Sequence, residues 1–531
     1  DPSPAEAQAA DAVELDSVIV TGTRTPKAID RIAGAISVVS KEEIKQTLAV
    51  TEDATAVLAR TVPGYAESSQ AMSNSGETLR GRIALRLFDG VPQGSPLREG
   101  GRNATFTDMG IVGRIEVING PSASEGIGAA GGIINYLSAV PEKEGNEFRL
   151  LTRYSTQFKD DSSGWKVGLN YMRKQDNYDL VVGASVIDRG MAYDADGRRV
   201  GMNTSGSVSD SVANNLFLKG GINFGEDGIQ RLQASYSHFK IEGNGDYIQV
   251  EGCRPGTCAN PVTNTSERGQ IYGSKAEFND FEQFNALYTH GDFLGGTLLL
   301  NAYWADQAMR YLPENGDDRQ LVWPLPVGAE RIFDHPEITS KKYGFRPSWT
   351  TSSLFDVSGL ERRMGVDFVQ DEAQQRLALT NRLWVPPMEY TSTAPYLQLS
   401  YDWGPVTLSA GYRREDGELH VDSYTTTPFR NSVFVEGGGV NYVENLVNFG
   451  GIWRIGGGWS VFASYGEGFS LPNIGIPLRN ISVPNQSVDR IRDLQAIVVD
   501  NREYGFNWRG DRGSFGGSYY DSRSPFGTSL A

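Results

Sequence analysis

The chain has 531 residues, enough for two or more domains, and its 49 basic and 65 acidic residues give a formal net charge of −16 at pH 7. This acidic balance argues against nucleic acid as a partner, and no run of about 18 apolar residues predicts a transmembrane helix. The mean hydropathy of −0.37 is typical of a soluble protein, but a transmembrane β-barrel also gives a low value because its apolar residues alternate with polar ones.

The N-terminal segment, residues 1–14, is polar and rich in Ala and acidic residues, which predicts disorder. It lacks the basic start and apolar core of a signal peptide, so an exported protein would here be represented by its mature chain. A short β-prone run follows, residues 15–21. This run either pairs with the sheet edge of another protein or forms the first strand of the next domain, and spacing alone favours neither.

Residues 30–140 are expected to form a small α/β unit. Strands are predicted at 36–39, 79–87 and 111–118, and helices follow Ser40, as an N-cap, and span 51–59. Asp89-Gly90 is a turn signal between strands. Pro141 and the charged residues after it mark a plausible domain boundary.

The segment 110–141 is the most distinctive part of this unit. Two short β patterns, 114–118 and 133–137, bracket a loop that is rich in Gly, Ala and Ser. Glycine permits positive φ and a close approach of backbones, so this segment is predicted to be a compact hairpin packed inside something larger.

After about residue 146 the pattern changes to segments of about ten residues with period-two alternation, of which we count about fifteen. The connections alternate in length, with short ones at 225–228, 402–405 and 456–458 and long ones at 243–275, 309–340, 375–390 and 471–497. Aromatic residues recur at strand ends, as in the girdles of an outer-membrane barrel. A soluble sandwich or propeller would have a similar strand count, but no repeat of blade length is visible.

The two cysteines, Cys253 and Cys258, do not suit a zinc site, which needs four ligands. A loop disulfide in an oxidising compartment is the favoured interpretation over two free thiols. The chain has only four His and shows no metal-binding motif, so no metal site is expected.

Four motifs follow one another along the chain: Leu79-Arg80-Gly81, the run 87–92 (LFDGVP), the run 114–122 (RIEVINGPS) followed by 131–135 (GGIIN), and the run 465–469 (YGEGF). In type and order these motifs resemble those of the TonB-dependent outer-membrane receptors. Residues Asp16, Ser17, Val18, Ile19 and Val20 resemble the TonB box. Together these motifs span most of the chain.

The resemblance implies a mainly β protein: a transmembrane antiparallel β-barrel of the 22-stranded type, with an N-terminal α/β plug domain in its lumen. The expected domains are a disordered N-terminus with the TonB box (1–24), the plug (25–141) and the barrel (142–531). About seven further strands would be needed to close such a barrel, so we expect the barrel to be C-terminally truncated, because an open edge in lipid leaves backbone groups unpaired.

The resemblance also implies polar contacts between plug and barrel. Arg80 and Arg114 are expected to pair with inward barrel carboxylates. Glu503 is the favoured partner because it alternates with lipid-facing aromatic residues, whereas Glu467 shares parity with the apolar face and would need a bulge to point inward.

The implied function is TonB-dependent import of a ferric siderophore across the outer membrane of a Gram-negative bacterium. TonB, the ferric siderophore and outer-membrane lipid are the expected partners, and ferric iron is carried as a chelate rather than held as a cofactor. Gln70, Arg82 and Glu125 lie where the family's apical plug loops contact ligand. Alternatives are import of cobalamin, haem or an oligosaccharide, or a passive porin. A secreted enzyme lacks a visible nucleophile, acid pair or metal site.

Overall fold

The computed structural model describes residues 19–20, 27–28, 31–68, 71–74, 76–95, 107–121, 126–202, 206–253, 255–313, 320–322, 332–352, 357–491, 494–510 and 513–525. For residues 19–20, 27–28 and 274 it describes only the backbone.

The largest element is a 15-stranded antiparallel sheet, in which each strand pairs with the next one in the sheet order and β10 and β29 form the edges. Its strands are β10 (Gly145–Ser155), β11 (Gly164–Lys174), β12 (Tyr178–Arg189), β13 (Ser211–Phe224), β14 (Gln230–Gly243), β17 (Phe278–Phe293), β18 (Gly296–Arg310), β19 (Pro336–Thr351), β20 (Leu360–Leu377), β21 (Arg382–Trp403), β22 (Val406–Val421), β25 (Gly438–Gly456), β26 (Trp459–Ser470), β28 (Ile497–Gly510) and β29 (Gly513–Arg523). The count of about fifteen strands is confirmed. In the described residues the sheet is open at β10 and β29, as expected for an incomplete barrel, and the 22-strand count of the family type is not confirmed.

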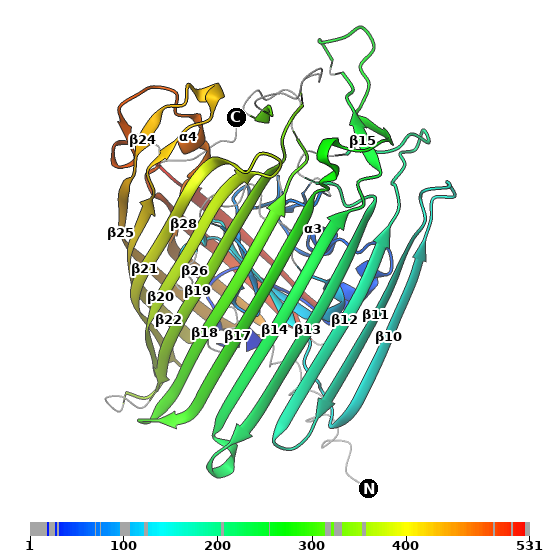
Figure 1. Cartoon of the computed structure of the whole chain (residues 1–531). Coiled ribbons are helices and arrows are strands. Elements are labelled where there is room, and N and C mark those ends of the chain that lie inside the picture. Colours follow the sequence, from blue (N-terminus) through cyan, green and yellow to red (C-terminus); the bar gives the residue numbers. More distant parts are fainter. Residues whose placement is uncertain are drawn as a thin grey trace.

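Period-two alternation gives this sheet two different faces. On β13, Phe217 is fully buried, whereas its neighbours Leu216 and Leu218 are each 40% exposed. Figure 1 shows the sheet as a curved wall with the N-terminal segments, in blue, on its concave side. The inner face therefore packs on those segments, and the outer face presents apolar side chains to the surroundings.

Connections are short at the lower rim in Figure 1 and mostly long at the upper rim. The upper connections carry β15 (Tyr247–Val250), β16 (Thr265–Arg268), η4 (Tyr272–Ser274), β23 (Tyr424–Thr425), η7 (Pro428–Arg430), β24 (Phe434–Glu436), α4 (Gly475–Asn480), β27 (Gln486–Ser487) and η8 (Val488–Arg490), and the lower rim carries η3 (Glu226–Gly228). Cys253 and Cys258 form the expected disulfide in the connection between β15 and β16, with Cα atoms 6.1 Å apart.

The predicted long loop at 375–390 is wrong. β20 runs to Leu377 and β21 begins at Arg382, so only a four-residue turn separates them. The fully buried Asp334 fixes this turn, because its carboxylate accepts hydrogen bonds from the backbone amides of Leu379 and Thr380 at 2.7 and 3.0 Å. Residues 383–387, which are apolar residues and prolines, belong to β21, so this strand begins well before the end of the predicted loop.

In its described residues, the N-terminal unit is a five-stranded sheet in the order β3-β8-β9-β6-β7 that is accompanied by the helices α2 and α3. Its elements are β3 (Ile36–Val39), α2 (Lys41–Leu48), α3 (Ala54–Thr61), β6 (Leu85–Phe88), β7 (Val91–Pro92), η2 (Met109–Ile111), β8 (Val112–Asn119) and β9 (Gly132–Ser138). Smaller pairs are β1 (Ile19–Val20) with β2 (Lys27–Ala28) and β4 (Tyr65–Ala66) with β5 (Thr78–Leu79).

Local signals explain most of these boundaries. Ser40 caps α2 in a full capping box with Glu43, as the sequence predicted for its N-cap. The second helix begins three residues later than predicted, because Asp53 caps it through the amide of Thr55. β8 and β9 form the predicted antiparallel hairpin, with Ile118 opposite Ile133.

This N-terminal unit, called the plug domain below, lies against strands from one end of the large sheet to the other. Its hydrophobic core extends onto Met172, Val181 and Phe217 of β11, β12 and β13. At the other end of the sheet, Ile127 forms a bridge to Phe469 of β26. The wall therefore wraps around the plug domain. β9 ends at Ser138 and β10 begins at Gly145, on either side of the expected boundary.

None of the helices in the described part of the chain is long and apolar enough to cross a membrane.

Candidate functional site

The plug domain is joined to β28 by a buried ion pair. The Nη2 atom of Arg80 lies 2.8 Å from Oε1 of Glu503, and the two side chains are 11% and 1% exposed. The Arg80 guanidinium also stacks on the Tyr520 ring, 4.3 Å from its centroid. Arg80 has a φ of 53°, in the left-handed region, so the backbone is turned to bring this side chain to the wall.

The other two residues predicted for this contact lie elsewhere. Arg114 pairs at 2.8 Å with Glu116, a carboxylate of its own strand and not of the barrel wall. Glu467 faces away from the plug, because its neighbours Gly466 and Gly468 are the residues that abut it. The Glu467 carboxylate instead accepts hydrogen bonds from the Val447 amide and the Tyr465 hydroxyl.

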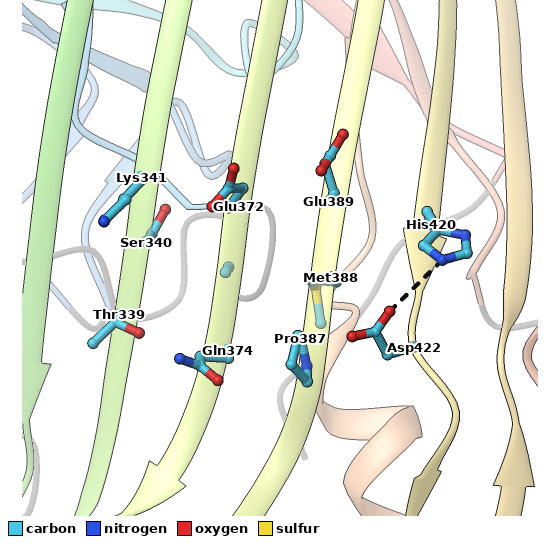
Figure 2. Close-up of a pocket in the computed structure, with 11 residues that line it drawn as sticks. Thr339, Ser340, Lys341, Glu372, Gln374, Pro387, Met388, Glu389, His420 and Asp422 are labelled. Atoms are coloured by element: carbon cyan, nitrogen blue, oxygen red, sulfur yellow. Dashed lines mark ion pairs between the residues drawn. The ribbon is translucent and has the colours of Figure 1, made fainter.

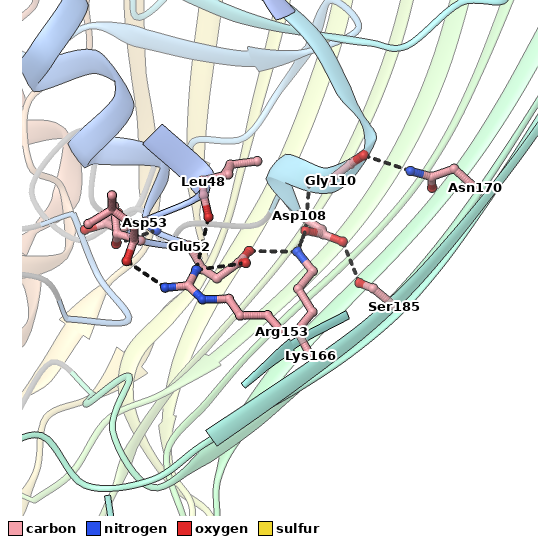
Figure 3. A network of polar contacts seen from close by, with 11 residues as sticks. Leu48, Glu52, Asp53, Asp108, Gly110, Arg153, Lys166, Asn170 and Ser185 are labelled. Atoms are coloured by element: carbon pink, nitrogen blue, oxygen red, sulfur yellow. Dashed lines mark hydrogen bonds and ion pairs between the residues drawn. The ribbon is translucent and has the colours of Figure 1, made fainter. Parts of the chain in front are cut away.

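A second ionic network joins the plug to β10, β11 and β12 (Figure 3). Lys166 of β11, only 2% exposed, lies 2.7 Å from Glu52 and 3.1 Å from Asp108 of the plug. Arg153 of β10 contacts Glu52 at 3.2 Å, and Ser185 of β12 donates a hydrogen bond to Asp108. Two acidic plug loops are thus held by two basic residues of the wall.

The charge state of this network follows from its contacts. Burial raises the pKa of Asp108, but the adjacent Lys166 ammonium and hydrogen bonds from Ser185 and the Gly110 amide outweigh it, so the pKa of Asp108 stays below its ordinary value. Removing one member of such a buried pair costs about 3–5 kcal/mol, because the remaining charge is left without compensation.

A third contact is made by the turn between β6 and β7, which contains Asp89-Gly90. The Asp89 carboxylate accepts hydrogen bonds from the amide and hydroxyl of Ser138, and Lys219 of β13 donates to that hydroxyl at 2.9 Å. Asn285 of β17 and Arg346 of β19 donate to the carbonyls of Asp89 and Gly90. The wall therefore binds this turn mostly through hydrogen bonds to the backbone of the turn.

The fourth contact is a close approach of a plug glycine to a buried arginine of the wall. A Cβ on Gly126 would lie 2.5 Å from Nη2 of Arg413, so only glycine fits at this position. Arg413 of β22 is buried between Asp367 of β20 and Glu415 of its own strand, at 2.6 and 2.9 Å. The glycine-rich loop after β8 is thus shaped to accept a buried arginine.

The predicted ligand residues are only partly placed. Arg82 donates to the hydroxyl and carbonyl of Ser522 on β29, at 3.0 and 3.2 Å, so its guanidinium belongs to the plug–wall contact. Gln70 and Glu125 lie outside the described residues, as do Asp16, Ser17 and Val18 of the predicted TonB box. Ile19 and Val20 pair with Lys27 and Ala28 in a short hairpin.

Cavities lie on both sides of the wall. A groove of about 400 Å³ lies across β19–β22, lined by Lys341, Glu372, Glu389 and His420, among others (Figure 2). These side chains alternate with inward ones such as Ser340 and Lys342, which are 2% and 1% exposed, so the groove is on the outer face, away from the plug. A cavity of about 370 Å³ lies between plug and wall, and we return to it below.

Sequence reasoning missed Lys166, Asp108, Arg346 and Arg413. Their signal was available in part: Lys166 and Arg413 stand at the inward parity of strands whose outward residues are apolar or aromatic. Nothing in the sequence identifies which plug segment each one meets. Within the described residues, no group of three or more His, Cys, Asp or Glu side chains could hold a metal ion.

The fold defines the class of plugged barrel proteins. In it, a curved antiparallel sheet binds an internal domain on its inner face through buried ion pairs. The family model for the TonB-dependent receptor-like β-barrel matches residues 223–524, and the TonB-dependent receptor plug domain model matches residues 28–133. The chain belongs to the TonB-dependent receptor family, a family of receptors and transporters of the Gram-negative outer membrane.

Curated relatives cover nearly the whole chain at low identity. The rhizobactin receptor of Rhizobium meliloti (strain 1021) is 23% identical over 94% of this chain and 70% of its own length. The ferric aerobactin receptor of Klebsiella pneumoniae is 22% identical over 96% of this chain and 72% of its own length.

Among solved structures, the FrpB iron transporter of Neisseria meningitidis (F3-3 variant) superposes with a TM-score of 0.64 and 17% identity, over 92% of this chain and 72% of that one. The ferric citrate transporter FecA gives a TM-score of 0.63 and 14% identity, over 93% and 70% of the two chains. At these identities the likeness establishes the fold.

Proposed function

We propose that this protein imports a ferric siderophore across the outer membrane, energised by contact of TonB with residues 16–20. The observation that carries the proposal is the polar contact between plug and wall, because ion pairs such as Arg80–Glu503 and Lys166–Asp108 can be replaced by water when the plug moves. The rhizobactin and ferric aerobactin receptors support a siderophore as the solute.

The outer face of the wall supports a membrane location. Four outward aromatic residues are register partners in one row: Tyr236, Phe284, Trp304 and Tyr343. Two residues further towards the long loops, the corresponding row contains His238, Glu282, Asp306 and Lys341. An aromatic row followed by an ionisable row is the pattern expected where hydrocarbon meets polar headgroups.

Near the short turns, a second aromatic group contains Trp459, Phe506, Trp508 and Phe515, whose rings lie 5.5–6.5 Å apart. It is the expected counterpart at the other membrane interface. From the first aromatic row towards the short turns, the outward residues are apolar, as at Ile222 and Leu232, which are register partners and each 45% exposed.

Haem is the weaker alternative as a solute. All four histidines belong to the described residues, and His238, His290 and His420 stand at outward positions of β14, β17 and β22. His335 is fully buried, where its Nε2 contacts the Tyr272 carbonyl at 3.3 Å. No histidine is therefore placed to ligate haem inside the wall.

The test is uptake of radiolabelled iron by cells that lack their own siderophore receptors and express the full-length gene. Hydroxamate and catechol chelates should be compared with cobalamin and haem. We expect uptake of at least one ferric chelate, abolished by deleting residues 16–20 or by removing TonB. Uptake that survives the deletion would indicate a passive porin and contradict the proposal.

A further inference from the structure

The cavity between plug and wall, called the side cavity below, lies next to the Lys166 network. Its lining comes from plug loops at residues 51–54, 71–72 and 107–109, and from the wall at β10, β12, β14 and β17 and the connection after β12. Its volume of about 370 Å³ is near the lower end of the range for small-molecule sites. It can hold a small molecule or one arm of a larger one.

Arg189, the last residue of β12, lines this cavity. It shares the inward parity of Ser185 and Ile187, which are 8% and 5% exposed. The Nη1 atom of Arg189 is buried and has no hydrogen-bond partner among the described residues. A buried guanidinium N–H without an acceptor costs free energy, so this geometry favours a ligand that supplies one.

The acidic residues around the side cavity, Glu52, Asp53 and Asp108, lie near enough to attract the Arg189 charge, but none of them accepts a hydrogen bond from its Nη1 atom. Glu52 contacts Lys166 and Arg153, and Asp108 contacts Lys166 and Ser185. Asp53 caps α3 through the amide and hydroxyl of Thr55, both at 2.9 Å. The side cavity thus contains one guanidinium, that of Arg189, with an N–H group that can still donate a hydrogen bond. The carboxylates nearby are paired with Lys166 and Arg153 or cap α3.

The remaining lining is mixed in a way that suits a carboxylate on an apolar body. Hydroxyl groups in the lining include those of Thr51 and Ser209, and apolar surface comes from Met72, Met109, Ile187, Met191, Phe239 and Ile241. Methionine side chains adapt to the outline of an aromatic ring. With a single spare cation, a monocarboxylate is favoured over a multiply charged phosphate.

We propose that the side cavity binds a carboxylate carried on a small apolar or aromatic body, with the Arg189 guanidinium holding the carboxylate. The source is either one arm of the imported chelate or a free aromatic acid. The first source rests on the proposed import function, whereas binding of the carboxylate itself does not.

The test is calorimetric titration of the purified full chain with salicylate and with salicylamide, its uncharged analogue of the same shape. We expect wild type to bind salicylate at least tenfold more tightly than salicylamide. Arg189→Gln should remove that preference, and Arg198→Gln should keep it, because Arg198 is 45% exposed and pairs with Asp194 in the connection after β12.

Ala192→Phe provides a second variant that leaves every charge in place, since Ala192 lines the side cavity. Filling the space should weaken both compounds together. The proposal is overturned if wild type does not prefer salicylate, or if Arg189→Gln and Arg198→Gln behave alike, whatever the outcome for iron uptake.

Uptake assays then separate the two sources. If Arg189→Gln slows import of a labelled ferric chelate at unchanged surface binding of that chelate, the carboxylate is an arm of the chelate. If salicylate binding is lost while import is unchanged, the site serves a free acid. If no ferric chelate is imported by wild type, the import function fails while the salicylate result stands.

Discussion

Arg80 brings together three kinds of contact at one point: an ion pair to Glu503, a hydrogen bond to Ser518 and stacking on Tyr520. All three partners are on β28 and β29. The Arg80 side chain therefore links its plug segment to the last two strands of the sheet.

Replacing Glu503 by Gln should loosen the plug, because the buried Arg80 charge loses its counter-charge. We expect the free energy of local opening of the plug to fall by roughly 2–4 kcal/mol, measured by hydrogen exchange of β8 and β9 amides. Glu467→Gln is the matched control, because Glu467 faces away from the plug. Equal effects of the two substitutions would contradict the assignment.

Replacing Gly131 by Ala should destabilise the plug by about 1–3 kcal/mol or more, since the added Cβ would lie 2.0 Å from the Ile83 carbonyl oxygen. Gly34→Ala is the control, with no atom within 4 Å of its Cβ. Urea unfolding of the plug, followed by the amides of β9, measures both. A neutral Gly131→Ala would show that the hairpin is less tightly packed than described.

At the scale of elements, Asp334 organises the turn between β20 and β21. Its carboxylate also accepts a hydrogen bond from the Thr380 hydroxyl at 2.7 Å. Asp334→Ala should expose the turn at 378–381 to protease at least tenfold faster, because several backbone amides lose their acceptor together. Asp422→Ala, at a residue whose side chain is 59% exposed, should leave cleavage unchanged. Peptide mapping after limited proteolysis distinguishes the two.

Glu277 makes one upper connection sensitive to pH. Burial raises its pKa to about 7, although the Ser207 amide donates to the carboxylate at 3.3 Å, and the nearby Asp210 carboxylate adds to the rise. A raised pKa means that the folded state binds more protons, so stability is highest below the unfolded value of about 4.5 and falls as pH rises to about 7.

We therefore expect the melting temperature of wild type to be lower at pH 8 than at pH 5, and this difference to shrink in Glu277→Gln. The amides of residues 206–210 should show the same trend in hydrogen exchange, since this segment also contacts the plug through Met72 and Gly206. An unchanged pH dependence in Glu277→Gln would assign the effect to other groups.

The sequence predicted the elements best where local rules and burial agree. Ser40 as a cap, the β8–β9 hairpin and the number of strands follow from capping, glycine content and alternation. The 375–390 loop failed because the pairing of β20 with β21 depends on Asp334, which lies far away in the sequence. Arg80 with Glu503 was foreseen from motif and parity, whereas Lys166 with Asp108 depends on which plug loop meets which strand.

At the scale of the whole molecule, the plug is held at separate points by different strands. Glu503 contacts the segment around Arg80, whereas Lys166 contacts Glu52 and Asp108, and the two sets share no partner. Combining Glu503→Gln with Lys166→Met should therefore lower plug stability by close to the sum of the single effects. Hydrogen exchange on the double variant measures this, and strong non-additivity would indicate that the plug responds as one rigid body.

The hydrogen bonds from Asn285 and Arg346 to the carbonyls of the Asp89-Gly90 turn have a mechanical consequence. A force applied to the N-terminal end of the chain would break such hydrogen bonds one at a time. The force needed is then set by a single hydrogen bond and not by their sum. Each carbonyl that is released can be hydrated at once, which makes the movement smooth in both directions. A plug domain bound in this way can be displaced by a small force and can return to its original position when the force is released.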